Sequence, residues 1–130
     1  MSAAVPVIKP LRRPRVWMAL WALAVLVVIV ACLIPPPPIP LPENGDKGEH
    51  FLAYFILAGS AVQLFRRGRP LLWVALGLVL MGVGIEFAQG ALTSNRSADP
   101  MDAIANTIGV LAGMGIALTP LRDILLRWRG

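Results

Sequence analysis

The sequence predicts an all-α membrane protein: a bundle of four transmembrane helices, with both termini cytoplasmic and a short C-terminal interfacial helix. Two observations predict this fold class. The 130 residues are 57% hydrophobic and only 15% charged, which is more apolar than a soluble domain of this length can bury. The apolar residues also fall into four runs separated by proline, glycine and charged residues, and a run of about 20 residues crosses a bilayer.

The first predicted span covers residues 16–34 and contains no charged residue. It is long enough to cross the hydrocarbon core, and it ends where the proline run 35–38 begins, because proline cannot extend a helix. It follows a basic cytoplasmic lead, residues 1–15. The span opens a single membrane domain, residues 16–119, and no separate soluble domain fits in the chain.

The second predicted span, residues 50–65, is short for a bilayer. It can gain length by beginning in the preceding acidic loop, which contains Glu43, Asp46 and Glu49. Snorkelling of the arginines that follow it can extend it at the other end.

The third predicted span, residues 70–92, begins with Pro70 at the position where a first helical residue is expected, and Glu86 is its single charge. The fourth, residues 101–119, ends before Pro120. The remaining residues, 120–130, form a cytoplasmic tail in which apolar and basic residues alternate at helical spacing, so we expect a helix lying along the interface. Its apolar face comprises Leu121, Ile124, Leu125 and Trp128.

Basic residues predict the orientation. Ten of the twelve lysine and arginine residues lie before the first span, between the second and third spans, or after the fourth. The positive-inside rule places those three segments in the cytoplasm, so both termini are inside and the two other loops are outside the inner membrane. The formal charge of +5 therefore reflects topology, and nucleic acid is not an expected partner.

The single cysteine, Cys32, excludes an intrachain disulfide and a multi-cysteine metal site. It also ends the stretch Ile29-Val30-Ala31-Cys32, which resembles a lipoprotein processing site. We favour a retained helix in which Cys32 is a small apolar filler, because such patterns are common in apolar helices.

Polar residues recur at helical spacing near the outer ends of the second, third and fourth spans. The steps of four, three and four residues keep each set within an arc of roughly 60°. Each helix therefore has one narrow face, polar outside and small or apolar further inward, and we expect the three faces to meet. The sets are His50, Tyr54, Leu57 and Ala61; Gly82, Glu86, Gln89 and Thr93; and Asp102, Asn106, Gly109 and Gly113.

Glu86 lies roughly 9 Å below the outer end of its span, so it must be paired, hydrated or protonated. Its candidate partners are His50, Lys47 and Arg96. Small residues allow helix backbones to approach closely beneath this polar level, and the expected packing positions are Gly82, Gly109 and Gly113.

Some of these polar residues have alternative structural roles. Gln89 and Asn106 can serve as hydrogen-bonding residues between helices. Tyr54 fits an interfacial anchor better than a catalytic acid.

This pattern resembles the VanZ-like membrane proteins, whose founding member is associated with resistance to the glycopeptide antibiotic teicoplanin. The resemblance covers roughly residues 46–113. It implies a bacterial inner-membrane protein that acts on the cell envelope. The residues that carry it are Asp46, Lys47, His50 and Tyr54; Glu86 and Gln89; and Arg96, Asp102, Asn106 and Gly109.

The leading functional hypothesis is an outward-facing site that binds an amphiphile, such as a lipid-linked envelope precursor or a lipophilic antibiotic. Basic side chains would meet anionic head groups, acidic side chains would meet amines or sugar hydroxyls, and the glycine-lined interior would hold an acyl chain. The candidate ligand-binding residues are Asp46, Lys47, His50, Tyr54, Glu86, Gln89, Arg96, Asp102 and Asn106.

Two other hypotheses remain open. In a membrane-embedded hydrolase or transferase, the catalytic candidates are His50, Glu86 and Asp102, which with Asp46 can also ligate a divalent metal. No cofactor is predicted, and no nucleophile motif is present. In a structural protein, the small-residue helix faces bind a membrane-protein partner or a second copy of the chain.

Overall fold

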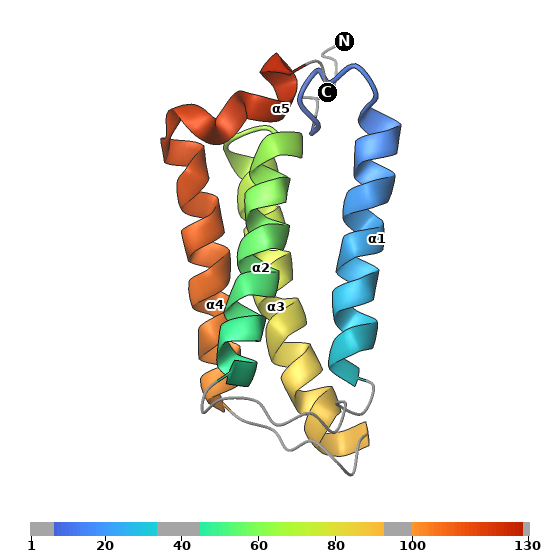
Figure 1. Ribbon diagram of the computed structural model, residues 1–130, viewed down its shortest axis with the longest axis vertical. Coiled ribbons are helices and arrows are strands. Elements are labelled where there is room, and N and C mark those ends of the chain that lie inside the picture. Colours follow the sequence, from blue (N-terminus) through green and yellow to red (C-terminus); the bar gives the residue numbers. More distant parts are fainter. Residues whose placement is uncertain (1–6, 34–44, 93–99, 129–130) are drawn as a thin grey trace.

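The computed structural model describes residues 7–33, 45–92 and 100–128, and the long elements in these ranges are all helices that run side by side (Figure 1). Successive long helices run in opposite directions, and the short C-terminal helices lie across one end of the bundle (Figure 1). The elements are α1 (Pro14–Leu33), α2 (Gly45–Leu64), α3 (Arg69–Leu92), α4 (Pro100–Met114), η1 (Gly115–Leu118), η2 (Pro120–Asp123) and α5 (Ile124–Arg127).

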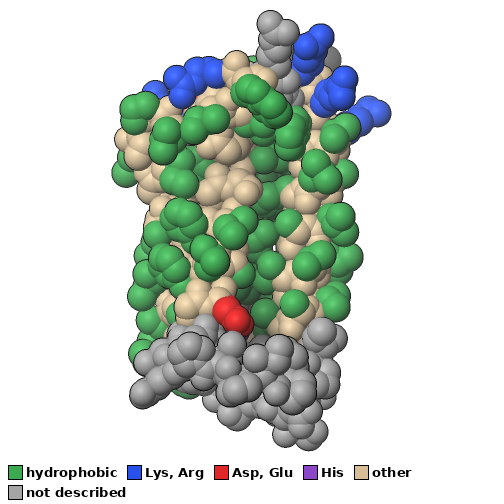
Figure 2. Space-filling model, viewed as in Figure 1, with side chains coloured by type: hydrophobic (Ala, Val, Ile, Leu, Met, Phe, Trp, Pro, Cys, Tyr) green, Lys and Arg blue, Asp and Glu red, His purple; other side chains and the backbone are tan. Residues whose placement is uncertain are grey.

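Three helical segments among the described residues are long and apolar enough to cross a membrane: Pro14–Leu33, Arg69–Ala88 and Pro100–Leu118. The long sides of the molecule present mainly hydrophobic side chains (Figure 2), as lipid-facing surfaces do. The all-helical membrane fold predicted from the sequence is therefore confirmed. α2 has the same 20-residue length as α1, and its role as a fourth span stays a prediction.

The start of the second helix agrees with the expectation that it begins within the acidic segment. α2 begins at Gly45, so Asp46 and Glu49 belong to its first turns. Carboxylates are favoured at a helix N-terminus because they complement the helix dipole. The fourth membrane-capable segment, Pro100–Leu118, ends before Pro120 as expected; α4 ends at Met114 and a 3-10 helix completes the segment.

α4 lies directly against the backbone of α2. A Cβ added at Gly109 would lie 2.5 Å from the carbonyl oxygen of Phe51, and one added at Gly113 would lie 2.6 Å from the Cβ of Ala58. Only glycine fits at such distances. The close helix approach inferred from these glycines is therefore present, and it is made between α2 and α4.

α1 packs more loosely. None of its residues is buried, and its clearest polar attachment to α2 is the hydrogen bond that Trp21 Nε1 donates to the Leu57 carbonyl oxygen, at 3.0 Å. The Trp21 ring also meets Phe65 edge to face, with ring centres 5.3 Å apart. α1 is thus held by Trp21 together with partly buried apolar residues along the helix, such as Met18 and Val25.

The chain segments before α1 and after α4 meet at the same end of the bundle. The Lys9 amide donates to the Leu64 carbonyl at 2.9 Å, and the Gln63 side chain bonds both the Leu121 carbonyl and the Leu125 amide, at 2.8 and 3.0 Å. Lysine and arginine side chains gather at this end (Figure 2). We call it the basic end.

Candidate functional site

The three predicted polar faces meet toward the end of the bundle that lies opposite the basic end. A Cβ added at Gly82 of α3 would lie 3.2 Å from the Asn106 Cβ of α4 and 3.5 Å from the Tyr54 ring of α2. Tyr54 is 0% exposed and Asn106 is 1% exposed. The glycine therefore provides the space in which the tyrosine and the asparagine meet α3.

A second level of polar residues lies one helical turn further from the basic end. It contains His50, Glu86 and Asp102, each one turn from the preceding level on its own helix, or about 6 Å. α3 runs opposite to α2 and α4 (Figure 1), so all three steps lead toward the same end. All three side chains are buried. We call the two levels together the polar cluster: His50, Tyr54, Gly82, Glu86, Asp102 and Asn106.

A hydrogen bond joins the two levels of the polar cluster. His50 Nδ1 and Asn106 Oδ1 are 3.1 Å apart, so the imidazole donates to the amide oxygen when Nδ1 carries a proton. The contact ties α2 to α4 and fixes the orientation of the asparagine amide. Its NH₂ group is then directed away from the histidine.

Two donors in the polar cluster lack an acceptor in the described part of the chain. The Tyr54 hydroxyl and the Asn106 Nδ2 are buried, and neither has a hydrogen-bond partner among the described residues. A buried donor without an acceptor costs about 1–3 kcal/mol. An oxygen atom supplied by a ligand or a water molecule would recover that free energy.

A cavity of about 200 Å³ lies against the polar cluster, between α1 and α2. From α2 it is lined by Glu49, His50 and Tyr54, which form its polar side. From α1 it is lined by the apolar or weakly polar residues Val27, Val28, Ala31 and Cys32. His50 and Tyr54 of the polar cluster therefore border open space on the side that faces α1.

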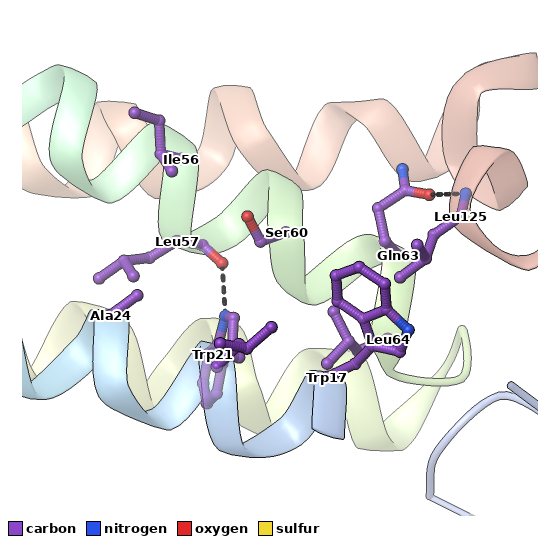
Figure 3. A pocket seen from close by; sticks show the side chains of 10 residues that line it. Trp17, Trp21, Ala24, Ile56, Leu57, Ser60, Gln63, Leu64 and Leu125 are labelled. Carbon is purple, nitrogen blue, oxygen red and sulfur yellow. Dashed lines mark hydrogen bonds between the residues drawn. The ribbon is translucent and has the colours of Figure 1, made fainter. Parts of the chain in front are cut away.

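The same seam between α1 and α2 contains a second cavity nearer the basic end, of about 260 Å³. Figure 3 shows its lining, in which Trp17 and Trp21 of α1 face Leu57 and Ser60 of α2. The lining is mainly apolar. The seam thus contains one cavity bordered by polar groups and a second, mainly apolar cavity nearer the basic end.

The glycine-lined interior is not a site for an acyl chain, which corrects the expectation from the sequence. The backbone of α2 fills the space beside Gly109 and Gly113, and Asn106 with Tyr54 fills the space beside Gly82. These glycines are therefore contact points between helices. Open space beside α2 lies on its other face, toward α1.

Some predicted site residues lie outside what the structure describes. Arg96 is outside the described residues, and the side chains of Asp46, Lys47 and Gln89 are not described. Among the residues that line the cavity beside the polar cluster, the ionisable Cys32 and Glu49 were not predicted as site residues. Glu49 could have been found as the neighbour of His50 at the start of the helix, whereas nothing in the apolar sequence of α1 distinguishes the position of Cys32.

Within the described part of the chain, no group of three or more histidine, cysteine, aspartate or glutamate residues can hold a metal ion. His50, Glu86 and Asp102 therefore do not form such a group. What the cluster offers is hydrogen bonding: carboxylate oxygens that accept from amines and hydroxyls, and the Tyr54 and Asn106 donors.

Comparison with known protein families gives a match over most of the chain. A family model described as VanZ/LLP1 matches residues 10–125, which include all four long helices and the whole polar cluster. Comparison with curated proteins and with solved structures found no match.

Proposed function

The chain belongs to the VanZ/LLP1 family, and from this membership and the geometry of the site we propose that it binds an amphiphile of the bacterial cell envelope. The head group occupies the polar cluster, and the hydrocarbon chain lies in the seam between α1 and α2. The observation that carries the proposal is the continuity between the two, since His50 and Tyr54 belong to the cluster and also line the cavity.

The chemistry of the polar cluster favours a head group rich in hydroxyls or amines. The carboxylates of Glu86 and Asp102 accept hydrogen bonds from such groups, and charged acceptors make the stronger bonds. The Tyr54 hydroxyl and the Asn106 amide donate to their oxygen atoms. Sugars of lipid-linked wall precursors and of lipoglycopeptide antibiotics such as teicoplanin have these groups.

Charge distribution supports a position for the site at the outer side of the inner membrane. The described lysine and arginine residues gather at the basic end (Figure 2), while the polar cluster lies toward the opposite end of the helices. With the basic end in the cytoplasm, four spans put both termini inside and the cluster in the outer leaflet. Envelope precursors and lipophilic antibiotics are found at that face.

The proposal is tested in a strain that lacks the gene, with wild type, Glu86→Gln and Asp102→Asn expressed at matched membrane levels. Susceptibility to teicoplanin and to detergents is measured. We expect both variants to behave as the deletion does, because each loses a charged acceptor while keeping its shape. Thr107→Ala is the matched control, since that hydroxyl bonds the Ala103 carbonyl of its own helix at 2.9 Å, and it should behave as wild type.

A binding measurement distinguishes a ligand site from a purely structural cluster. Cys32 is the single cysteine and lines the cavity beside the cluster, so its rate of alkylation by a maleimide reports occupancy of the seam. Teicoplanin added to wild-type protein should slow alkylation, and Glu86→Gln should abolish the protection. If all variants behave as wild type in both assays, the cluster is a packing device and binding of a membrane-protein partner becomes the better interpretation.

A further inference from the structure

A separate groove lies at the basic end, between α3 and α4, with a volume of about 430 Å³. Its walls are apolar, formed by residues such as Leu71 and Ala75 of α3 and Leu111 and Met114 of α4. The single charged residue in its lining is Arg67, at the turn before α3. The groove shares no residue with the polar cluster.

We propose that this groove binds an anionic phospholipid of the cytoplasmic leaflet, with the lipid phosphate at Arg67 and one acyl chain between α3 and α4. A cationic group at the mouth of an apolar groove matches the two parts of such a lipid. The position of the arginine is set by its neighbour Gly68, whose φ of 102° reverses the chain direction before α3 in a conformation that favours glycine.

The charge of Arg67 is available to a ligand. The side chain is exposed, and it makes no hydrogen bond or ion pair with any described residue. Its neighbour differs, because Arg66 Nε donates to the Ile8 carbonyl at 3.2 Å. Arg67 is therefore not needed to hold the fold together at this turn.

The surroundings of Arg67 are complementary to an anion. A smaller cavity of about 80 Å³ adjoins the groove and shares Arg67 with it, and this cavity is also lined by Lys9, Arg122 and Asp123. Asp123 is paired with Lys9, at 2.8 Å. Three cations against one carboxylate leave a net positive charge where a phosphate would lie.

The occupant we infer is a lipid and not a free phosphate ion, because the cation cluster continues directly into the apolar groove. A free anion would use only the cluster and would leave about 430 Å³ of apolar space unexplained. Arg67 and Leu71 line both cavities, which makes a continuous path from the head group to the chain. This inference does not rest on the proposed function, since the two sites lie at opposite ends.

Native mass spectrometry of the purified full chain tests the proposal, with phosphatidylglycerol and phosphatidylcholine of identical chains as probes. We expect phosphatidylglycerol to bind about fivefold more tightly to wild type. Arg67→Gln should remove most of this preference. Gly115→Leu should weaken both lipids, because Gly115 lines the groove and an added Cβ there has no neighbour within 4 Å, so the side chain can enter the open space.

Matched controls separate these effects from general changes in charge or size. Arg13→Gln removes an exposed arginine that lies outside both cavities, and Gly77→Leu adds the same side chain on α3 where it also meets nothing within 4 Å. Both should bind lipid as wild type does. Equal binding of the two lipids, or an equal effect of Arg67→Gln and Arg13→Gln, would overturn the proposal. Displacement of phosphatidylglycerol by inorganic phosphate alone would show a simple anion site and would overturn it too.

Discussion

The two faces of α2 pack against their neighbours in opposite ways. On one face, α4 touches the α2 backbone at Gly109 and Gly113. On the other face, α1 has no buried residue and leaves cavities of about 200 and 260 Å³. In a membrane, helices associate through close packing and hydrogen bonds because lipid is as apolar as their side chains. The α2–α4 contact therefore supplies the rigid platform, and the α1–α2 seam supplies the accessible space.

Residue size explains the difference. α4 presents glycines and the short Asn106 side chain to α2, so the helix axes approach closely. α1 presents the larger side chains of Trp17 and Trp21 to α2, and a cavity remains beside them. The polar cluster lies between these two contacts. The α2–α4 contact fixes its residues, and His50 and Tyr54 also line a cavity in the α1–α2 seam.

The largest expected effect comes from breaking the α2–α4 contact with Gly109→Leu. An added Cβ would lie 2.5 Å from the Phe51 carbonyl oxygen, and a backbone atom cannot move aside as a flexible side chain can. We expect the free energy of unfolding to fall by about 3 kcal/mol or more. Thermal unfolding in detergent, followed by the recovery of monodisperse protein on size-exclusion chromatography, measures the loss.

Gly84→Leu is the matched control for this prediction. It makes the same substitution on α3 at an exposed glycine where an added Cβ has no neighbour within 4 Å. Its Tm should stay close to that of wild type. Equal losses in the two variants would mean that close approach to α2 is not what makes Gly109 necessary.

Loosening the α1–α2 seam with Trp21→Phe should have a smaller effect. The substitution keeps an aromatic ring near Phe65 but removes the donor to the Leu57 carbonyl. Leu57 lies in the interior of α2, so its carbonyl can still accept a backbone hydrogen bond of the helix when the tryptophan donor is lost. The expected loss of stability is therefore under about 1 kcal/mol. The alkylation rate of Cys32 should nevertheless rise, because α1 loses its best-defined attachment and the seam opens more often.

The comparison with a surface tryptophan sharpens this second prediction. Trp73 of α3 is 69% exposed, and Trp73→Phe should change neither the Tm nor the alkylation of Cys32. A loss for Trp21→Phe as large as that for Gly109→Leu would contradict the idea that α1 is only loosely held.

Much of the fold and the convergence of the polar faces could be predicted from local sequence pattern. Uncharged runs and proline breaks place the helices, and steps of four, three and four residues put His50, Gly82 and Asn106 on faces that meet in the structure. Such periodicity depends only on helix geometry. It therefore needs no knowledge of how the helices pack.

What could not be predicted depends on contacts between helices. The acidic residues Asp46 and Glu49 are typical of a loop, and the sequence does not show where in this segment the helix begins. In the structure they lie at the start of α2, where the helix dipole stabilises them. Spacing does not reveal whether Gly109 faces empty space or a neighbouring backbone. The uniform apolar sequence of α1 also gives no sign that Cys32 lines a cavity, because its partner helix decides that.

The smallest effect concerns the electrostatic anchor at the basic end. Lys9 Nζ lies 2.8 Å from Asp123 Oδ1, and its hydrogen bond holds the pKa of Asp123 below the ordinary value. A lowered folded-state pKa stabilises the protein above the unfolded-state pKa, near 3.9, and this contribution is lost as the pH falls through the folded-state pKa. The gain is small because the Asp123 side chain is 37% exposed.

Lys9→Met should therefore lower the Tm slightly and by a constant amount above about pH 5, and the difference from wild type should shrink as Asp123 becomes protonated. Arg13→Met, which removes an exposed cation before α1, should show no such pH dependence. Lys9 also donates to the Arg122 carbonyl, at 2.6 Å, and that bond does not titrate with Asp123. A difference that persists undiminished at about pH 2 would assign the anchor to the carbonyl and not to the ion pair. In either case Lys9 attaches the segment before α1 to the chain after α4. This attachment at the basic end allows α1 to pack loosely along the seam and still remain in the bundle.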